Sequence, residues 1–323
     1  MFSEPELQAA HALVRRFMAA TPAHDWPLLG EALGTRLIVK HENHAPTGAF
    51  KVRGGITFMD WLSRTHPAME GVVTATRGNH GQSQARAAIA MGLRAKILVP
   101  EGNSVEKNAA MRAFGAELVV HGADFDEARE EAMRLAETEP LYPVPPFHNE
   151  LVRGVATYGL ELFTAHPDLG RVYVPIGAGS GLCGTIAARD ALGLNCEVVG
   201  VVSEGAPGAK LSVEAGHLVE TNSAATFADG IAVRVPVQAA FDIYAEKAHH
   251  IGVVSDDEIA QAMRLYYAAT HNIAEGAGAA ALALALQEKE QLAGRKVAVV
   301  LSGGNIDRPL YQTVLEGGTP RPG

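Results

Sequence analysis

Short apolar runs alternate with helix-forming segments along most of the chain, and this alternation constrains the fold more than any other feature of the sequence. We expect strands at residues 36–40, 72–76, 95–99, 117–120, 171–176, 197–202 and 295–301. We expect helices at residues 5–19, 82–91, 104–114, 124–136, 157–163, 182–192 and 255–267. Strands that are separated by helices form parallel sheets, because the helix is the crossover connection and then covers a face of the sheet.

A proline-rich stretch at residues 142–146 interrupts this alternation and indicates a crossing between two lobes. We place a small lobe at residues 48–147 and a large lobe at residues 1–47 and 148–323, with only a short tail after Asn305. The expected fold class is α/β, with two doubly wound lobes and mostly parallel sheets. In such folds, ligands bind at the carboxyl ends of the strands.

Composition excludes several classes of function. The 27 Lys and Arg against 36 Asp and Glu give a formal net charge of −9, and there is no dense basic run, so we expect no nucleic-acid partner. The two cysteines, Cys183 and Cys196, are too few for a disulfide framework and suit a reducing compartment. Residues 1–6 do not resemble an export signal, and the uncharged stretch 172–188 holds a proline and four glycines. We therefore expect a soluble, cytoplasmic protein with no membrane partner.

The first of four notable loops leads from a strand to Lys51, which follows Phe50 at the expected start of a helix. A lysine amine that is partly removed from water becomes a nucleophile and can form a Schiff base with a carbonyl group. The alternative is a solvated lysine at a helix start, and Phe50–Lys51 alone does not exclude it.

The second loop, residues 76–81, follows an apolar strand and precedes a helix. Backbone amides at such a helix start can bind a carboxylate, and the side chain of Asn79 can donate to a ring oxygen. A tight turn without a ligand is the alternative.

The third loop is rich in glycine and also lies between a strand and a helix. Its amides and one hydroxyl can surround a phosphate group. The residues are Gly177, Ala178, Gly179, Ser180 and Gly181. A dinucleotide turn would need a third glycine where Leu182 stands, and we find no acidic partner for a ribose, so a nicotinamide cofactor is disfavoured. Helix packing without phosphate is the alternative.

The fourth loop places Ser302 at the end of the last apolar strand, where its hydroxyl can contact an aromatic nitrogen. A simple glycine turn would explain this loop equally well. The four loops together offer an amine for an aldehyde, an amide for a phenolic oxygen, a phosphate site and a hydroxyl for a ring nitrogen. One cofactor carries all four of these groups.

These loops, in this order, resemble the fold-type-II pyridoxal-phosphate enzymes, and specifically the serine/threonine dehydratase (threonine ammonia-lyase) and serine racemase branch. The likeness covers nearly the whole chain and implies a tryptophan-synthase-β-like fold, with pyridoxal 5'-phosphate on the large lobe. It implies Lys51 as the catalytic Schiff-base lysine. It implies cofactor contacts from Phe50, Asn79, Gly177, Ala178, Gly179, Ser180, Gly181, Glu275 and Ser302. Substrate contacts are expected from Thr76, Arg77, Asn79 and His80.

The implied reaction is β-elimination from a small β-hydroxy amino acid, which gives a 2-oxo acid and ammonia. The amine of Lys51 is then placed to take the Cα proton. Arg77 stands where serine racemases carry a second base, and its guanidinium stays charged, so racemisation is disfavoured. Arg77 can instead pair with a second substrate carboxylate, as in 3-hydroxyaspartate, or with a local acid.

Further expectations also follow from the resemblance. Lys210 replaces the second acid of the divalent-cation site that some relatives have near Glu204, so we expect no metal. A homodimer is the family expectation, and the C-terminal regulatory domain of biosynthetic threonine deaminases is expected to be absent. A β-replacing synthase and a ligand-binding relative without turnover are the competing interpretations.

Overall fold

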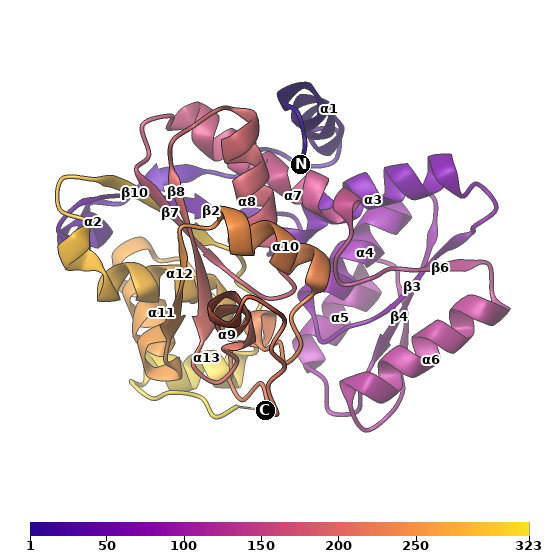
Figure 1. The fold of residues 1–323 in the computed structure, drawn as a ribbon. Helices are drawn as coiled ribbons and strands as arrows, with labels where there is room; N and C mark the ends of the chain where they lie inside the picture. The colour runs from indigo at the N-terminus through magenta and orange to yellow at the C-terminus, as the bar shows by residue number, and fades with distance from the viewer. Residues whose placement is uncertain (323) are drawn as a thin grey trace.

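The computed structural model describes residues 1–322 and contains one sheet of six strands and one of four. The six-stranded sheet has the order β1-β2-β10-β7-β8-β9, and every neighbouring pair is parallel except β1 with β2. Its strands are β1 (Ala23–Asp25), β2 (Arg36–His41), β7 (Arg171–Pro175), β8 (Glu197–Ser203), β9 (His250–Val254) and β10 (Lys296–Leu301). Figure 1 shows this sheet and its helices beside a smaller lobe.

Helices cover both faces of the six-stranded sheet, as parallel sheets require. Successive residues of a strand point to opposite faces, so Val299 of β10 and Val300 belong to different core clusters. The α-helices of this part are α1 (Glu4–Val14), α2 (Pro27–Leu33), α7 (Asn149–Ala165), α8 (Ser180–Ala191), α9 (Gly208–Ala215), α10 (Gln238–Lys247), α11 (Asp256–Thr270), α12 (Gly276–Gln287) and α13 (Arg308–Leu315). Short 3₁₀ helices occupy Glu42–His44, Asp229–Ile231 and Lys289–Gln291.

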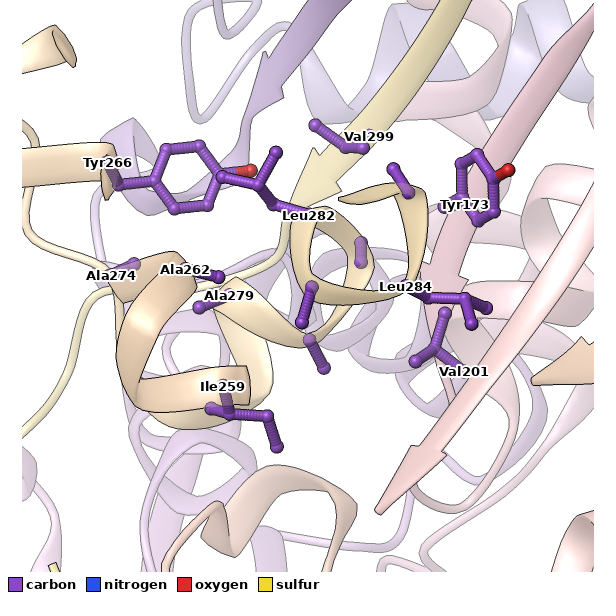
Figure 2. Close-up of a cluster of buried hydrophobic side chains, with 14 of the residues drawn as sticks. Tyr173, Val201, Ile259, Ala262, Tyr266, Ala274, Ala279, Leu282, Leu284 and Val299 are labelled. Carbon is purple, nitrogen blue, oxygen red and sulfur yellow. The ribbon is translucent and has the colours of Figure 1, made fainter. Parts of the chain in front are cut away.

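Helix α12 lies at the centre of one of these clusters. Ten of its residues, from Gly276 to Ala285, are buried, and all ten are alanine, leucine or glycine. Figure 2 shows Leu282 and Leu284 of this helix packed between Tyr266 of α11 and the strand residues Tyr173 and Val201. A helix that is apolar on all sides has to be buried, and its small residues let α11 and the sheet approach closely.

The four-stranded sheet has the order β5-β4-β3-β6 and is parallel throughout. Its strands are β3 (Gly71–Ala75), β4 (Arg94–Val99), β5 (Glu117–Val120) and β6 (Leu141–Pro143). Helices α3 (Lys51–Thr65), α4 (Asn79–Ala90) and α5 (Val105–Ala113) pack on one face, and α6 (Phe125–Thr138) covers the other (Figure 1). The sequence expectation of an α/β fold with mostly parallel sheets is confirmed, whereas the division at residues 47/48 and 147/148 stays a prediction.

The structure differs from the sequence expectation at several places, and it also contains strands and helices that were not expected, namely β1, β9, α2, α9, α10 and α12. Residues 142 and 143, which belong to the stretch 142–146 that was expected to be a crossing, lie in the edge strand β6, and α7 begins at Asn149 rather than near residue 157. The expected tail after Asn305 contains helix α13. Within residues 1–322, no helix is both long and apolar enough to cross a lipid bilayer.

Candidate active site

The loop before Lys51 and the loop after β10 are joined by backbone hydrogen bonds. β2 and β10 are parallel neighbours, so their carboxyl ends lie side by side. The amide of Phe50 donates to the carbonyl of Ser302 at 3.0 Å, and the amide of Gly304 donates to the carbonyl of Gly48 at 2.9 Å. The chain ends of two adjacent strands therefore hold Lys51 and Ser302 in one place.

All ten residues predicted to contact a cofactor line a single pocket at the carboxyl ends of these strands. They are Phe50, Lys51, Asn79, Gly177, Ala178, Gly179, Ser180, Gly181, Glu275 and Ser302. Pro175, Gly230, Ile231 and Ala277 complete its wall. The predicted substrate residues Thr76, Arg77 and His80 do not line this pocket.

Lys51 is the first residue of helix α3, and its amine has no hydrogen-bond or ion-pair partner within the described chain. The Nζ atom lies 4.7 Å from the centre of the Phe50 ring. Ser83 of α4 donates its hydroxyl to the Lys51 carbonyl at 2.6 Å, which fixes the backbone there. Burial lowers the pKa of the Lys51 amine, while the carboxylate of Glu275 acts in the opposite direction. The amine thus has no partner in the described chain, and its burial favours the neutral form.

The glycine loop ends at the start of helix α8, whose first residue is Ser180. Gly179 has a φ of 101°, a left-handed conformation that side chains with a Cβ rarely adopt. A Cβ on Gly177 would lie 2.2 Å from the carbonyl oxygen of Gly230. The first amides of a helix lack intrahelical partners and carry the positive end of the helix dipole. The loop therefore presents amides of the kind that can bind an anion, and a larger residue at position 177 would push it away from the Gly230 carbonyl.

Asn79, the first residue of α4, contacts Glu275 across the pocket. Its Nδ2 donates to Oε1 of Glu275 at 2.7 Å. Glu275 is only 6% exposed, and burial raises the pKa of its carboxyl group to about 7, against the opposing effects of Lys107, Asn79 and Lys51. Glu275 thus gains and loses its proton near neutral pH, next to the amine of Lys51.

The loop between β3 and α4 uses its first side chain to hold its own shape. The hydroxyl of Thr76 accepts from the amides of Gly78 and Gly81, at 3.0 and 3.3 Å. The next side chain, Arg77, is exposed and has no hydrogen-bond or ion-pair partner among residues 1–322. Nε2 of His80 is buried without a partner, and burial, followed by the charge of Lys51, lowers the pKa of this imidazole to about 3. His80 is therefore neutral.

Two residues near the pocket were not predicted from the sequence. Lys107 of α5 places its amine 2.8 Å from Oδ2 of Asp229. This ion pair links the lobe of the four-stranded sheet to the lobe of the six-stranded sheet. Asn305 donates to the side chain of Asn79 at 2.8 Å. Asn305 could have been found from the sequence, because it is a polar residue that directly follows Ser302 and two glycines. Nothing near Lys107 in the sequence indicates that Asp229 is its partner.

The region of the expected missing metal site contains an ion pair. Nζ of Lys210 lies 2.8 Å from Oε1 of Glu214, one helical turn away on α9. No cluster of three or more His, Cys, Asp or Glu side chains able to hold a metal ion occurs in the part of the chain that the structure describes.

Comparison with known proteins identifies the family. Residues 14–303 match the family described as pyridoxal-phosphate dependent enzyme. The chain is 37% identical to an L-threonine ammonia-lyase of Geobacter sulfurreducens, over 89% of this chain and 72% of that protein. It is 30% identical to an L-threo-3-hydroxyaspartate ammonia-lyase of Saccharomyces cerevisiae, over 94% of this chain and 93% of that protein. The processed threonine deaminase isoform 2 of Solanum lycopersicum superposes with a TM-score of 0.89 and 30% identity, over 98% of this chain and 94% of that one. The chain therefore belongs to the pyridoxal-phosphate dependent enzyme family, in the branch that contains the threonine ammonia-lyases.

Proposed function

We propose that this chain is a pyridoxal 5'-phosphate-dependent ammonia-lyase that eliminates the β-hydroxyl group of a small β-hydroxy amino acid and releases a 2-oxo acid and ammonia. The observation that carries the proposal is the single pocket in which the unpaired amine of Lys51 faces the glycine loop, Glu275 and Ser302. The relatives named above support the class of reaction, because they include ammonia-lyases of threonine and of 3-hydroxyaspartate.

The residues of the pocket fit this cofactor chemically. The start of α8 offers free amides and the Ser180 hydroxyl to a phosphate group. The loop before it needs glycine at position 177, because a Cβ there would lie 2.2 Å from the carbonyl oxygen of Gly230. Asn79 offers an amide donor to a phenolic oxygen, and Ser302, which is 4% exposed, offers a hydroxyl to a ring nitrogen. When bound, pyridoxal phosphate supplies an electrophilic carbonyl carbon and an aromatic ring that accepts electrons.

Lys51 has two roles in this proposal. Its amine is the nucleophile that holds the cofactor, and burial favours the neutral form that this role needs. When it is free and neutral, the same amine would be the base that accepts the proton from the substrate Cα. The imidazole of His80 is neutral, so it is not a competing cation beside this amine.

Ser302 favours elimination over reactions that hold negative charge at Cα for a long time. Its hydroxyl is uncharged, so it cannot stabilise a protonated ring nitrogen as a carboxylate would. When the β-substituent leaves, it takes up the negative charge that develops at Cα. The aromatic ring then has less charge to stabilise.

The start of α4 is the proposed binding site for the substrate carboxylate. Its first amides follow the turn that Thr76 stabilises, and they lie next to Lys51 through the contact between Ser83 and the Lys51 carbonyl. The residues proposed to contact the substrate are Thr76, Arg77, Asn79 and His80.

Arg77 supports a second candidate substrate, a β-hydroxy amino acid with a second carboxylate, such as 3-hydroxyaspartate. Arg77 lies in the loop between β3 and α4, and its guanidinium is exposed without an acidic partner in the described residues. An arginine binds a carboxylate through two parallel hydrogen bonds. If Arg77 recognises a second carboxylate, Arg77→Ala should lose activity on 3-hydroxyaspartate by on the order of 2–4 kcal/mol in transition-state stabilisation. Equal losses on threonine and on 3-hydroxyaspartate would exclude this role.

The proposed reaction is tested by measuring product release with purified, cofactor-loaded protein. L-serine, L-threonine, both 3-hydroxyaspartate diastereomers and phenylserine should be compared for 2-oxo acid and ammonia, with Lys51→Ala as the inactive control. A β-replacing synthase would need a second nucleophile for turnover, and a binding protein would release neither product. Absence of both products with all five substrates would exclude the ammonia-lyase.

We also propose that the enzyme is a cytoplasmic homodimer. The family expectation supports the dimer, and the reduced, buried cysteines Cys183 and Cys196 are compatible with the cytoplasm. Light scattering coupled to size-exclusion chromatography measures the mass in solution, and a monomer would contradict the first part.

A further inference from the structure

We infer that Asn305 is a positioning residue that determines which end of the Asn79 amide faces the cofactor. The inference rests on the proposed function, in which the side-chain N–H group of Asn79 donates to a cofactor oxygen. Asn305 itself does not line the pocket that contains Lys51.

A backbone carbonyl fixes the orientation of the Asn305 side chain. Nδ2 of Asn305 donates to the carbonyl oxygen of Thr47 at 2.8 Å. A backbone carbonyl is only an acceptor, so the nitrogen end of the Asn305 amide has to face it. The same Nδ2 donates its second hydrogen to Oδ1 of Asn79 at 2.8 Å.

The orientation of Asn79 follows from that of Asn305. Because Nδ2 of Asn305 is a donor, the Asn79 atom that faces it has to be the acceptor, Oδ1. The nitrogen end of Asn79 then points the other way, where Nδ2 donates to Oε1 of Glu275 at 2.7 Å. A chain of hydrogen bonds from the Thr47 carbonyl thus presents a donor to the pocket. With the reverse orientation, a carbonyl oxygen would face both Glu275 and the cofactor oxygen.

The loop around Gly48 holds this chain of hydrogen bonds in place. Gly48 has a φ of 68°, and a Cβ on it would lie 2.4 Å from Oδ1 of Asn305. The carbonyl of Gly48 accepts from the amide of Gly304, the residue before Asn305. The Thr47 carbonyl and the Asn305 backbone are therefore fixed relative to each other, and the side chain of Asn305 fills the space that glycine leaves.

The decisive variant is Asn305→Asp, which has almost the same shape but replaces both donors with acceptors. We expect it to bind pyridoxal phosphate roughly 10- to 100-fold more weakly, because Asn79 turns to donate to the new carboxylate and no longer donates to the cofactor. The visible absorption maximum of the bound cofactor should also shift relative to the parent. Asn103→Asp, which replaces a donor to Asn108 outside the pocket, should leave both readouts unchanged.

A double-mutant cycle separates positioning from a general structural role. Asn305→Ala should weaken cofactor binding in the parent, and it should have no further effect in the Asn79→Ala background. A parental affinity and spectrum for Asn305→Asp would overturn the inference, and so would an equal effect of Asn305→Ala in both backgrounds. If the parent protein itself fails to bind pyridoxal phosphate on Lys51, the proposed function fails, and the two failures are therefore distinguishable.

Discussion

Arg53 lies two residues after Lys51, and we predict that it is essential for stability because it joins two buried carboxylates. Its side chain is fully buried. The guanidinium donates to both oxygens of Glu42 at 2.8 and 3.0 Å, and to both oxygens of Glu161 at 2.9 and 2.8 Å. Glu161 also pairs with Lys40 at 2.6 Å, so two cations balance two anions in this cluster.

Replacing Arg53 with methionine leaves this cluster with an uncompensated buried negative charge. Glu42 is fully buried, and its nearest remaining cation is Lys40 at 3.9 Å. Removing one partner of a buried ion pair costs about 3–5 kcal/mol, whereas replacing the whole pair can cost little. Arg53→Met should therefore lose about 3–5 kcal/mol of unfolding free energy, and Glu42→Gln in the same chain should restore part of it.

Urea unfolding followed by far-ultraviolet circular dichroism measures this loss. Arg64→Met is the matched control, because Arg64 lies on the same helix and forms an exposed ion pair with Asp60 at 2.8 Å. Exposed pairs contribute about 1 kcal/mol or less. If Arg53→Met costs no more than Arg64→Met, or if Glu42→Gln destabilises the Arg53→Met variant further, the reasoning about the buried charge is wrong.

Two further predictions concern the pocket. Burial raises the pKa of Glu275 from 4.5 to about 7 in the cofactor-free protein. Between these values the folded state keeps a proton that the unfolded chain has lost, so stability should fall by about 3 kcal/mol as the pH rises from 4.5 to 7. Glu275→Gln should flatten this slope in urea unfolding measured across the range, and an unchanged slope would contradict the assignment. Gly177→Ala places a Cβ 2.2 Å from the Gly230 carbonyl and should weaken pyridoxal phosphate binding at least about 10-fold in a fluorescence titration, while Gly170→Ala, which meets only ordinary contacts, should not. Equal affinities of the two alanine variants would argue against a close-packed phosphate loop.

The sequence allowed the strand ends to be predicted because glycine and polar residues mark them directly. Lys51, Asn79 and Ser302 each follow such a signal, and the structure brings them into one pocket, although their roles stay predictions. The edge strand β6 was missed because Pro143 is unusual in a strand, but it lies at the sheet edge, where a missing amide donor is tolerated.

Helix α12 and the contacts between the lobes could not be predicted from the sequence, for two different physical reasons. α12 is apolar on all sides, so it has no alternation between a polar and an apolar face to recognise. Lys107 and Asp229 are 122 residues apart, and only the tertiary fold brings them together. The orientation of Asn79 likewise depends on Asn305, which is 226 residues away.

The central claim is the covalent attachment of pyridoxal phosphate to the amine of Lys51, and one measurement tests it directly. Purified protein supplied with pyridoxal phosphate is reduced with borohydride, digested and examined by mass spectrometry. We predict one pyridoxyl group, located on Lys51 and absent from Lys51→Ala. A protein that stays colourless and carries no such group, or that carries it on another lysine, would contradict the assignment.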